Sequence, residues 1–401
     1  MKRIITIALL LLTIAPCLNA QKKELSQART IIKSGKDIDK AITMMDKLLG
    51  EPKNSGNIQI WLTRAEAYRA LYEQGNERLY LNQKQDTAEL FLNARKMFLA
   101  YEQLDSVDAL PDKKGKSQPK YRRKHAEYLK DYRTNLFYGG NYFLRIGRPE
   151  DAYSMMETFL GTTTSPLFSS QSIGDDKNLP TAAYVTVVAG YQMKKPAMTL
   201  AYSDKALLDS LRLDNTLVYI SETYRELGDQ GNYILSLWKG FHNKPTSEYF
   251  FSRLFDYYNN KHEEDSAMMV VDEALRSNER YMIALKAKSD LLLNRGDNDK
   301  CISLSKDIIS RDSTVTNAYY NIGAAYINKA MKRKEGRVDA AARKKIRGYY
   351  KNALRYMEDY RKLEPDNIQM WGPALYDIYL ELNMGSKFEE MERLLRRNAS
   401  L

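Results

Sequence analysis

Residues 251–285 decide the fold, and they read FSRLFDYYNNKHEEDSAMMVVDEALRSNERYMIAL. Apolar residues recur at helical spacing on both sides of a polar stretch that centres on His262. The first and second groups are Phe251, Leu254, Tyr258 and then Ala267, Val271, Ala274. A spacing of three and four residues places each group on one face of a helix. This stretch therefore predicts two helices joined by a short turn.

The same pattern returns at a fixed interval of about 34 residues, here called the period. This is the repeat length of known helical hairpin repeats. Large apolar residues stand one period apart at Leu217, Phe251, Leu285 and Tyr319, and each opens a stretch with helical spacing. In such a repeat each hairpin buries its apolar face against its neighbours. The chain also has few helix breakers, with 20 Gly and 11 Pro in 401 residues, which favours helix.

These residues resemble the tetratricopeptide repeat (TPR), whose pattern is a large apolar residue, then Leu-Gly, Tyr, Ala, an aromatic residue, Ala and Pro. The resemblance covers nearly the whole chain after residue 20, from a degenerate pair at 24–49 to a closing pair that starts near Trp371. It implies an all-α, right-handed superhelical solenoid of about nine TPR-like helix-turn-helix hairpins, some with extended or inserted helices. An irregular helical bundle is the alternative, and four anchors at one spacing argue against it.

The period also predicts how the chain is organised. We expect a signal peptide at 1–20, N-terminal TPR-like hairpins at 21–160 with insertions at about 69–93 and 106–124, a loop insertion at 161–180, and a regular array at 181–401 with a basic insertion at about 331–348. The hairpins with insertions at 69–93 and 331–348 carry similar numbers of extra residues, 17 and 18, so we expect each insertion to extend both helices of its hairpin by about two turns. The 161–180 stretch is rich in Ser, Thr, Gly and Asp and predicts a surface loop.

The first 20 residues have the order of a secretory signal, with Lys2 and Arg3 before an apolar run of about 12 residues. That run is shorter than the roughly 20 residues that span a bilayer as a helix. We therefore expect export to the periplasm or to an outer-membrane-associated location in a bacterium. Cleavage after Ala20 is the preferred site, and the alternative is a cut a few residues away. The residues before Cys17, which include Pro16, depart from a lipoprotein signal, so we do not expect lipidation.

The charge of the exported chain is positive, with 60 basic against 51 acidic residues once Lys2 and Arg3 are removed. Because an exported protein rarely meets nucleic acid, we expect no nucleic-acid partner and consider peripheral contact with an anionic envelope surface. The residues predicted to make that contact lie in the basic insertion and are Lys332, Arg333, Lys334, Arg343, Lys344 and Lys345. The alternative is a solvated helix extension that keeps the protein soluble.

The resemblance implies that the first helix of each hairpin lines a concave groove. The residues that this frame turns toward a partner are Arg225, Asp256, Asn259, Asn260, Lys286, Asp290, Asn294, Tyr320 and Asn328. Asn260, Asn294 and Asn328 stand one period apart, and a ladder of amides can bond an extended peptide backbone. The alternative is that these asparagines only end helices. Likewise, Tyr320, Tyr376 and Tyr379 offer stacking surface for a sugar or an aromatic anchor, or else pack in the core.

Catalytic patterns are missing from the sequence. His125, His242 and His262 fall on different repeats, and no phosphate-binding glycine loop or nucleophile motif is present. We therefore predict no enzyme activity, no cofactor and no metal site. The leading hypothesis is an exported non-enzymatic scaffold that mediates protein–protein interaction in a bacterial cell envelope through a protein or peptide partner. The alternative is a glycan- or nutrient-binding envelope protein that uses exposed tyrosines. The sequence makes no prediction of oligomeric state.

Overall fold

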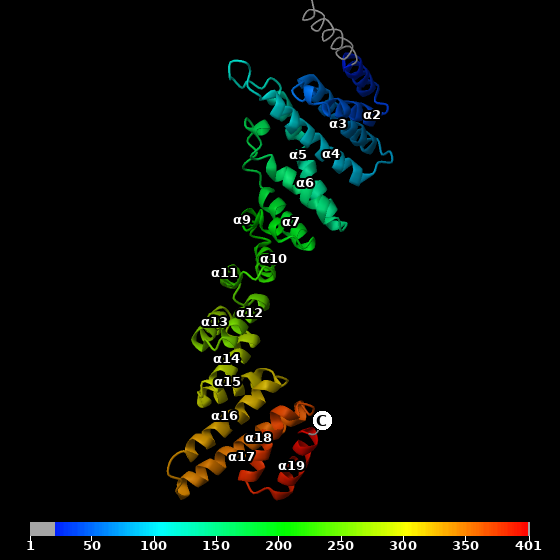
Figure 1. Ribbon diagram of the computed structural model, residues 1–401. Coiled ribbons are helices and arrows are strands. Elements are labelled where there is room, and N and C mark those ends of the chain that lie inside the picture. Colours follow the sequence, from blue (N-terminus) through cyan, green and yellow to red (C-terminus); the bar gives the residue numbers. More distant parts are fainter. Residues whose placement is uncertain (1–20, 400–401) are drawn as a thin grey trace, which may run out of the picture. The chain divides into compact units, whose positions relative to one another are not determined.

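The structure is a computed structural model that describes residues 21–399. Within these residues the regular secondary structure is helical, and no β-strand occurs (Figure 1). The predicted signal peptide at 1–20 lies outside the described residues. The chain forms two compact units, of which the first ends at Tyr233 and the second begins at Ile234. The division falls within α11 (Gln230–Asn243).

The first unit contains a helix over 21–34 and a series of helices that follow it. These are α2 (Ile38–Leu49), α3 (Ile58–Tyr80), α4 (Thr87–Asp108), α5 (Arg122–Arg145), α6 (Pro149–Gly161), α7 (Leu179–Gln192), α8 (Pro196–Leu200), α9 (Ser203–Ala206) and α10 (Leu213–Glu226). Two 3₁₀ turns, η1 (Pro52–Asn54) and η2 (Pro166–Phe168), lie between them.

The second unit is a more regular series. Its helices are α12 (Glu248–Asn260), α13 (Glu264–Ser277), α14 (Met282–Asn294), α15 (Asn298–Arg311), α16 (Thr316–Lys334), α17 (Ala340–Leu363), α18 (Ile368–Glu381) and α19 (Gly385–Ala399). Each helix packs on the next, and the first helices α14, α16 and α18 also contact one another in turn. The hairpins of this unit are therefore stacked side by side.

The turns of the hairpins show the repeat directly. Lys194, Gly228, His262 and Gly296 stand one period apart, and their φ angles are 55°, 71°, 58° and 75°. This left-handed conformation is easy for glycine and costs energy for a residue with a Cβ atom. Lys194 and His262 adopt it nonetheless, because the hairpin requires the same turn at each repeat.

The apolar anchors also occupy equivalent places. Leu217, Phe251 and Leu285 each precede a left-handed turn residue by 11 positions, and all three are buried. Tyr319, in the repeat with the long insertion, is half-buried near the start of α16. The predicted fold class, an all-α array of TPR-like hairpins, is confirmed by this spacing and by the stacking of the helices.

Two hairpins have longer helices than the others, as expected from their insertions. Helices α3 and α4 have 23 and 22 residues, and α16 and α17 have 19 and 24. The regular pair α14 and α15 has only 13 and 14. The second helix of each long hairpin is capped at its N-terminus. The Asp86 side chain accepts hydrogen bonds from backbone amides at the start of α4, and the Asp339 side chain accepts one at the start of α17.

The 161–180 segment differs from the surface loop that its composition predicts. Leu167, Phe168 and Ile173 are all buried in the core of the first unit. The Phe168 ring stacks on Phe98 with 6.1 Å between ring centroids. These apolar residues are isolated or paired in a polar stretch, so they produce no helical or strand periodicity.

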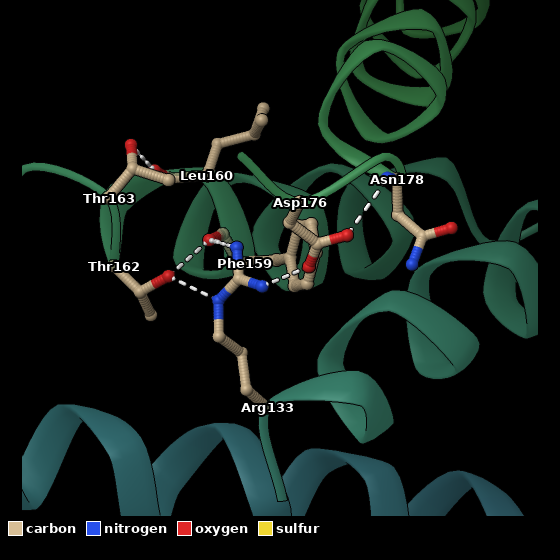
Figure 2. Close-up of polar contacts among 7 residues, drawn as sticks. All are labelled: Arg133, Phe159, Leu160, Thr162, Thr163, Asp176 and Asn178. Carbon is tan, nitrogen blue, oxygen red and sulfur yellow. Dashed lines mark hydrogen bonds and ion pairs between the residues drawn. The ribbon is translucent and has the colours of Figure 1, made fainter. Parts of the chain in front are cut away.

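Arg133 holds this segment in place (Figure 2). Its Nε donates to Thr162 Oγ1 at 2.7 Å, and its Nη2 donates to the Phe159 carbonyl at 3.3 Å. Its Nη1 forms an ion pair with Asp176. Arg133 is only 4% exposed, and its guanidinium carbon lies 3.7 Å from the centroid of the Phe159 ring. One side chain of α5 thus bonds both ends of the segment.

The hairpin that begins with α7 has a broken second half. Two short helices, α8 and α9, with five and four residues, replace a single long one. At Gly190 in α7, a Cβ atom would lie 2.5 Å from the Thr199 nitrogen and 2.8 Å from the Met198 carbonyl carbon. This close approach of two backbones requires glycine at position 190.

Candidate functional site

A cleft of about 410 Å³ lies where α16, α17 and α18 meet in the second unit. Helices α16 and α18 are the first helices of adjacent hairpins, which is the kind of helix that the TPR resemblance assigns to ligand contact. The residues that line the cleft are Ile327, Met331, Lys334, Glu335, Tyr350, Asp377, Leu380 and Glu381.

The charged side of the cleft is mainly acidic. Lys334 forms an ion pair with Glu381, and its ammonium lies 5.0 Å from the centroid of the Tyr350 ring. Asp377 has no hydrogen bond or ion pair within residues 21–399, and partial burial together with the Glu381 carboxylate raises its pKa. Lys334 attracts the Asp377 carboxylate but forms its ion pair with Glu381, so the cleft offers carboxylates without an ion pair at Asp377 and at Glu335.

The apolar side of the cleft is open to solvent. Met331 is 56% exposed and Leu380 is 52% exposed, whereas Tyr350 is buried. Exposed aliphatic side chains next to an unpaired carboxylate can bind a ligand that combines an apolar group with a positive charge.

Of the predicted groove residues, Asp290 has the best-defined surroundings. Its Oδ1 accepts hydrogen bonds from Asn317 Nδ2 and Asn321 Nδ2, both at 2.6 Å. Asn321 also donates to Ser289 Oγ at 2.9 Å, and burial raises the pKa of Asp290. These bonds connect α14 to α16, so they give Asp290 a role in the packing of neighbouring hairpins.

The other predicted groove residues are dispersed. Arg225 is in the first unit, where it forms an ion pair with Glu222 on its own helix. Asn260 and Asn294 are exposed and are the last residues of α12 and α14. The remaining members also lie in the second unit: Asp256, Lys286 and Asn328 are exposed, and Asn259 and Tyr320 are half-buried.

None of the nine predicted groove residues lines the α16–α18 cleft, whereas Lys334 of the predicted basic set does. Lys332 and Arg333 instead line a hollow of about 390 Å³ with Lys329 and Tyr349. Arg343, Lys344 and Lys345 are exposed near the start of α17. The sequence frame missed Asp377 and Leu380 because it gives no information about which exposed residues of adjacent hairpins face one another.

Of the two alternatives for these tyrosines, stacking surface or core packing, Tyr379 takes the second. That residue is 2% exposed, and its hydroxyl donates to Glu358 Oε1 at 3.1 Å. Tyr376 packs on Phe388 with 4.7 Å between ring centroids, and Tyr320 packs on Tyr360 at 5.4 Å. Tyr376 and Tyr379 are three residues apart on the side of α18 that faces its neighbours, so the packing of hairpins takes up the rings that a sugar would need.

Metal-ligating and nucleophilic side chains are dispersed or buried in the described part of the chain. No group of three or more His, Cys, Asp or Glu side chains is placed to hold a metal ion within residues 21–399. Cys301 is a free, buried thiol, and burial raises its pKa, which disfavours the reactive thiolate. Nor does this part of the chain contain a helix that is both long and apolar enough to span a bilayer.

No family model and no curated protein sequence matches the chain. Among solved structures, the C-terminal part of a TPR repeat-containing protein from Cytophaga hutchinsonii is 11% identical, with a TM-score of 0.41, over 64% of this chain and 92% of that chain. A TPR-repeat protein from Bacteroides fragilis is 19% identical, with a TM-score of 0.31, over 60% and 97%. Human IFIT1 with m7Gppp-AAAA is 15% identical, with a TM-score of 0.37, over 82% and 72%. These overall superpositions are loose, so the TPR-type fold rests on the hairpins of this chain.

Proposed function

We propose that this chain is a non-enzymatic scaffold that binds a peptide segment of a partner protein in the α16–α18 cleft. The observation that carries the proposal is that two residues of α18 line the cleft together: Asp377, whose carboxylate has no hydrogen bond or ion pair within residues 21–399, and Leu380, whose aliphatic side chain is exposed. A peptide with an apolar residue next to Lys or Arg would cover Leu380 and bring a cation to Asp377. The excess of carboxylates in the cleft disfavours the phosphates of a nucleic acid.

The proposed setting is a bacterial cell envelope, in the periplasm or in association with the outer membrane. Support for it comes from the basic start and short apolar run of the first 20 residues. Sequencing of the N-terminus of the purified protein by mass spectrometry tests this part, because an unprocessed chain that begins at Met1 would contradict export.

The affinity of the cleft should be modest. Covering two exposed aliphatic side chains contributes through the roughly 25 cal/mol gained for each Å² of apolar surface removed from water. A half-exposed ion pair with Asp377 adds about 0.2–1 kcal/mol. Since association itself costs several kcal/mol, we expect micromolar rather than nanomolar binding to a single peptide.

A peptide-display selection tests the proposal. We expect the selected peptides to share an apolar residue beside Lys or Arg, and we expect Asp377→Lys or Leu380→Glu to abolish their binding. Glu389→Lys is the matched control, since Glu389 is an exposed carboxylate of α19 outside the cleft. Selected peptides that bind all three variants equally would place the binding site elsewhere, and enrichment of acidic peptides would contradict the charge argument.

A further inference from the structure

The outer end of the α16–α17 hairpin, here called the basic tip (residues 332–347), is a second surface that adjoins the peptide cleft and shares Lys334 and Glu335 with it. Both helices of this hairpin are longer than those of the hairpin before it, since α16 has 19 residues against 13 in α14, and α17 has 24 against 14 in α15. At about 1.5 Å per residue, these extensions correspond to roughly 9–15 Å of added length. The loop that joins α16 to α17 lies at the end of the extension (Figure 1).

The basic tip carries a set of cations that nothing else in the described chain neutralises. Its side chains that are exposed and have no ion pair within residues 21–399 are Lys332, Arg337, Arg343, Lys344, Lys345 and Arg347. Only two carboxylates, Glu335 and Asp339, lie in the same stretch. Asp339 is engaged as a helix cap, because its Oδ1 accepts a bond from the Ala342 amide at 2.7 Å. Like charges at this density repel one another, so the tip gains energy from an external anion.

The exposed cations are spread along the hairpin, which favours binding to an extended anionic surface over binding to a single anion. Lys344 of the tip, and Lys351 and Arg355 beyond it, are all exposed. They lie seven and then four residues apart on one side of α17, which makes a strip roughly 16 Å long. At the outer end, Val338 is 38% exposed in the loop between the two helices, with Arg337 before it and Asp339 after it, and the next cations begin at Arg343. An aliphatic residue among Lys and Arg suits the boundary between headgroups and acyl chains, where the apolar group enters and the cations meet phosphates.

We propose that the basic tip docks on an anionic lipid surface, with its cations on headgroup phosphates and Val338 in the headgroup layer. Each Lys or Arg near such a surface changes partitioning about fivefold at moderate ionic strength. Removal of three of the six cations therefore weakens binding roughly 100-fold. Added salt weakens it as well, because the charges are exposed and screened.

Vesicle co-sedimentation tests the charge. The protein is purified from cells after processing, and its N-terminus is identified by mass spectrometry. It is then mixed with vesicles of pure phosphatidylcholine or with vesicles of phosphatidylcholine and phosphatidylglycerol. We expect binding only when phosphatidylglycerol is present, and a loss of roughly 100-fold in Arg343→Gln/Lys344→Gln/Lys345→Gln. The matched control is Lys113→Gln/Lys114→Gln/Lys116→Gln, which removes three exposed cations from the first unit and should leave binding within about twofold of wild type.

A fluorescent probe tests the position of the loop. A Val338→Cys variant labelled with an environment-sensitive dye should shift its emission to the blue on anionic vesicles, and the buried Cys301 should not react with the dye. Failure of the wild-type protein to bind anionic vesicles would overturn the proposal, as would equal losses in both triple variants or an unchanged emission in the bound state. Tip-dependent binding to polyglutamate or RNA without vesicle binding would assign the surface to another partner class.

Discussion

Gly190→Ala is the substitution for which the structure gives the sharpest prediction. The added Cβ atom would lie 2.5 Å from the Thr199 nitrogen, whereas ordinary contact begins at 3.4 Å, so α7 and α8 must separate by about 0.9 Å. The atoms in the way are backbone atoms, and no side-chain rotation relieves the contact.

The magnitude follows from two opposing effects. Ala in place of Gly in a helix interior normally stabilises by about 0.5–1 kcal/mol. Overpacking of a close contact costs about 1–3 kcal/mol, and a rigid neighbour places the cost at the upper end. We therefore expect Gly190→Ala to lower the free energy of unfolding of this region by about 1–2 kcal/mol.

Hydrogen exchange followed by mass spectrometry measures this effect where it occurs, at the amides of α7. Gly348→Ala is the matched control, because Gly348 lies inside α17 and its added Cβ would meet no atom within 4 Å. We expect that control to slow exchange in α17 by the equivalent of about 0.5–1 kcal/mol. If Gly190→Ala also slowed exchange in α7, the close approach of the two backbones would be refuted.

Two further predictions concern the first unit. Arg133→Met should lower the free energy of unfolding by about 3 kcal/mol, because it leaves the Asp176 carboxylate without its cation and Thr162 without a donor. Urea unfolding measures this, and a midpoint equal to wild type would contradict the anchoring role. Burial lowers the pKa of His125 to about 4, below its unfolded value of about 6.5, so the unfolded state binds more protons between these values and stability falls as pH drops through that window. The loss between pH 7 and pH 4 should be about 2–3 kcal/mol larger in wild type than in His125→Gln, and parallel pH profiles for the two proteins would refute it.

The repeat could be predicted from the sequence because its buried apolar residues recur at a fixed spacing. Leu217, Phe251 and Leu285 mark the period, and the turn residues confirm it. The burial of Leu167 and Phe168 could not be foreseen, because two apolar residues in a polar stretch give no periodic signal. The partners that hold the segment, Arg133 and Phe98, are distant in sequence.

The candidate site was less accessible to sequence reasoning. The frame identifies which residues of a helix are exposed, but a cleft depends on which exposed residues of two hairpins face each other. Asp377 and Leu380 belong to α18, whose partner residues on α16 lie about 50 positions earlier in the chain. The repeat pattern also does not reveal when a charged side chain already has hydrogen-bond partners within the protein. Asp290 is an example, because its carboxylate accepts hydrogen bonds from Asn317 and Asn321.

The ladder of contacts in the second unit has an evolutionary consequence. The helices there pack mainly on their sequence neighbours and on the next first helix, so residues 278–311, which contain α14 and α15, form one interchangeable module whose length is one period. A gene that gains such a stretch in frame adds a hairpin between helices that pack in the same order, whereas its loss would remove the bonds that Asp290 accepts from Asn317 and Asn321. This packing therefore allows the chain to grow by whole hairpins between the two that have long helices, α3–α4 and α16–α17.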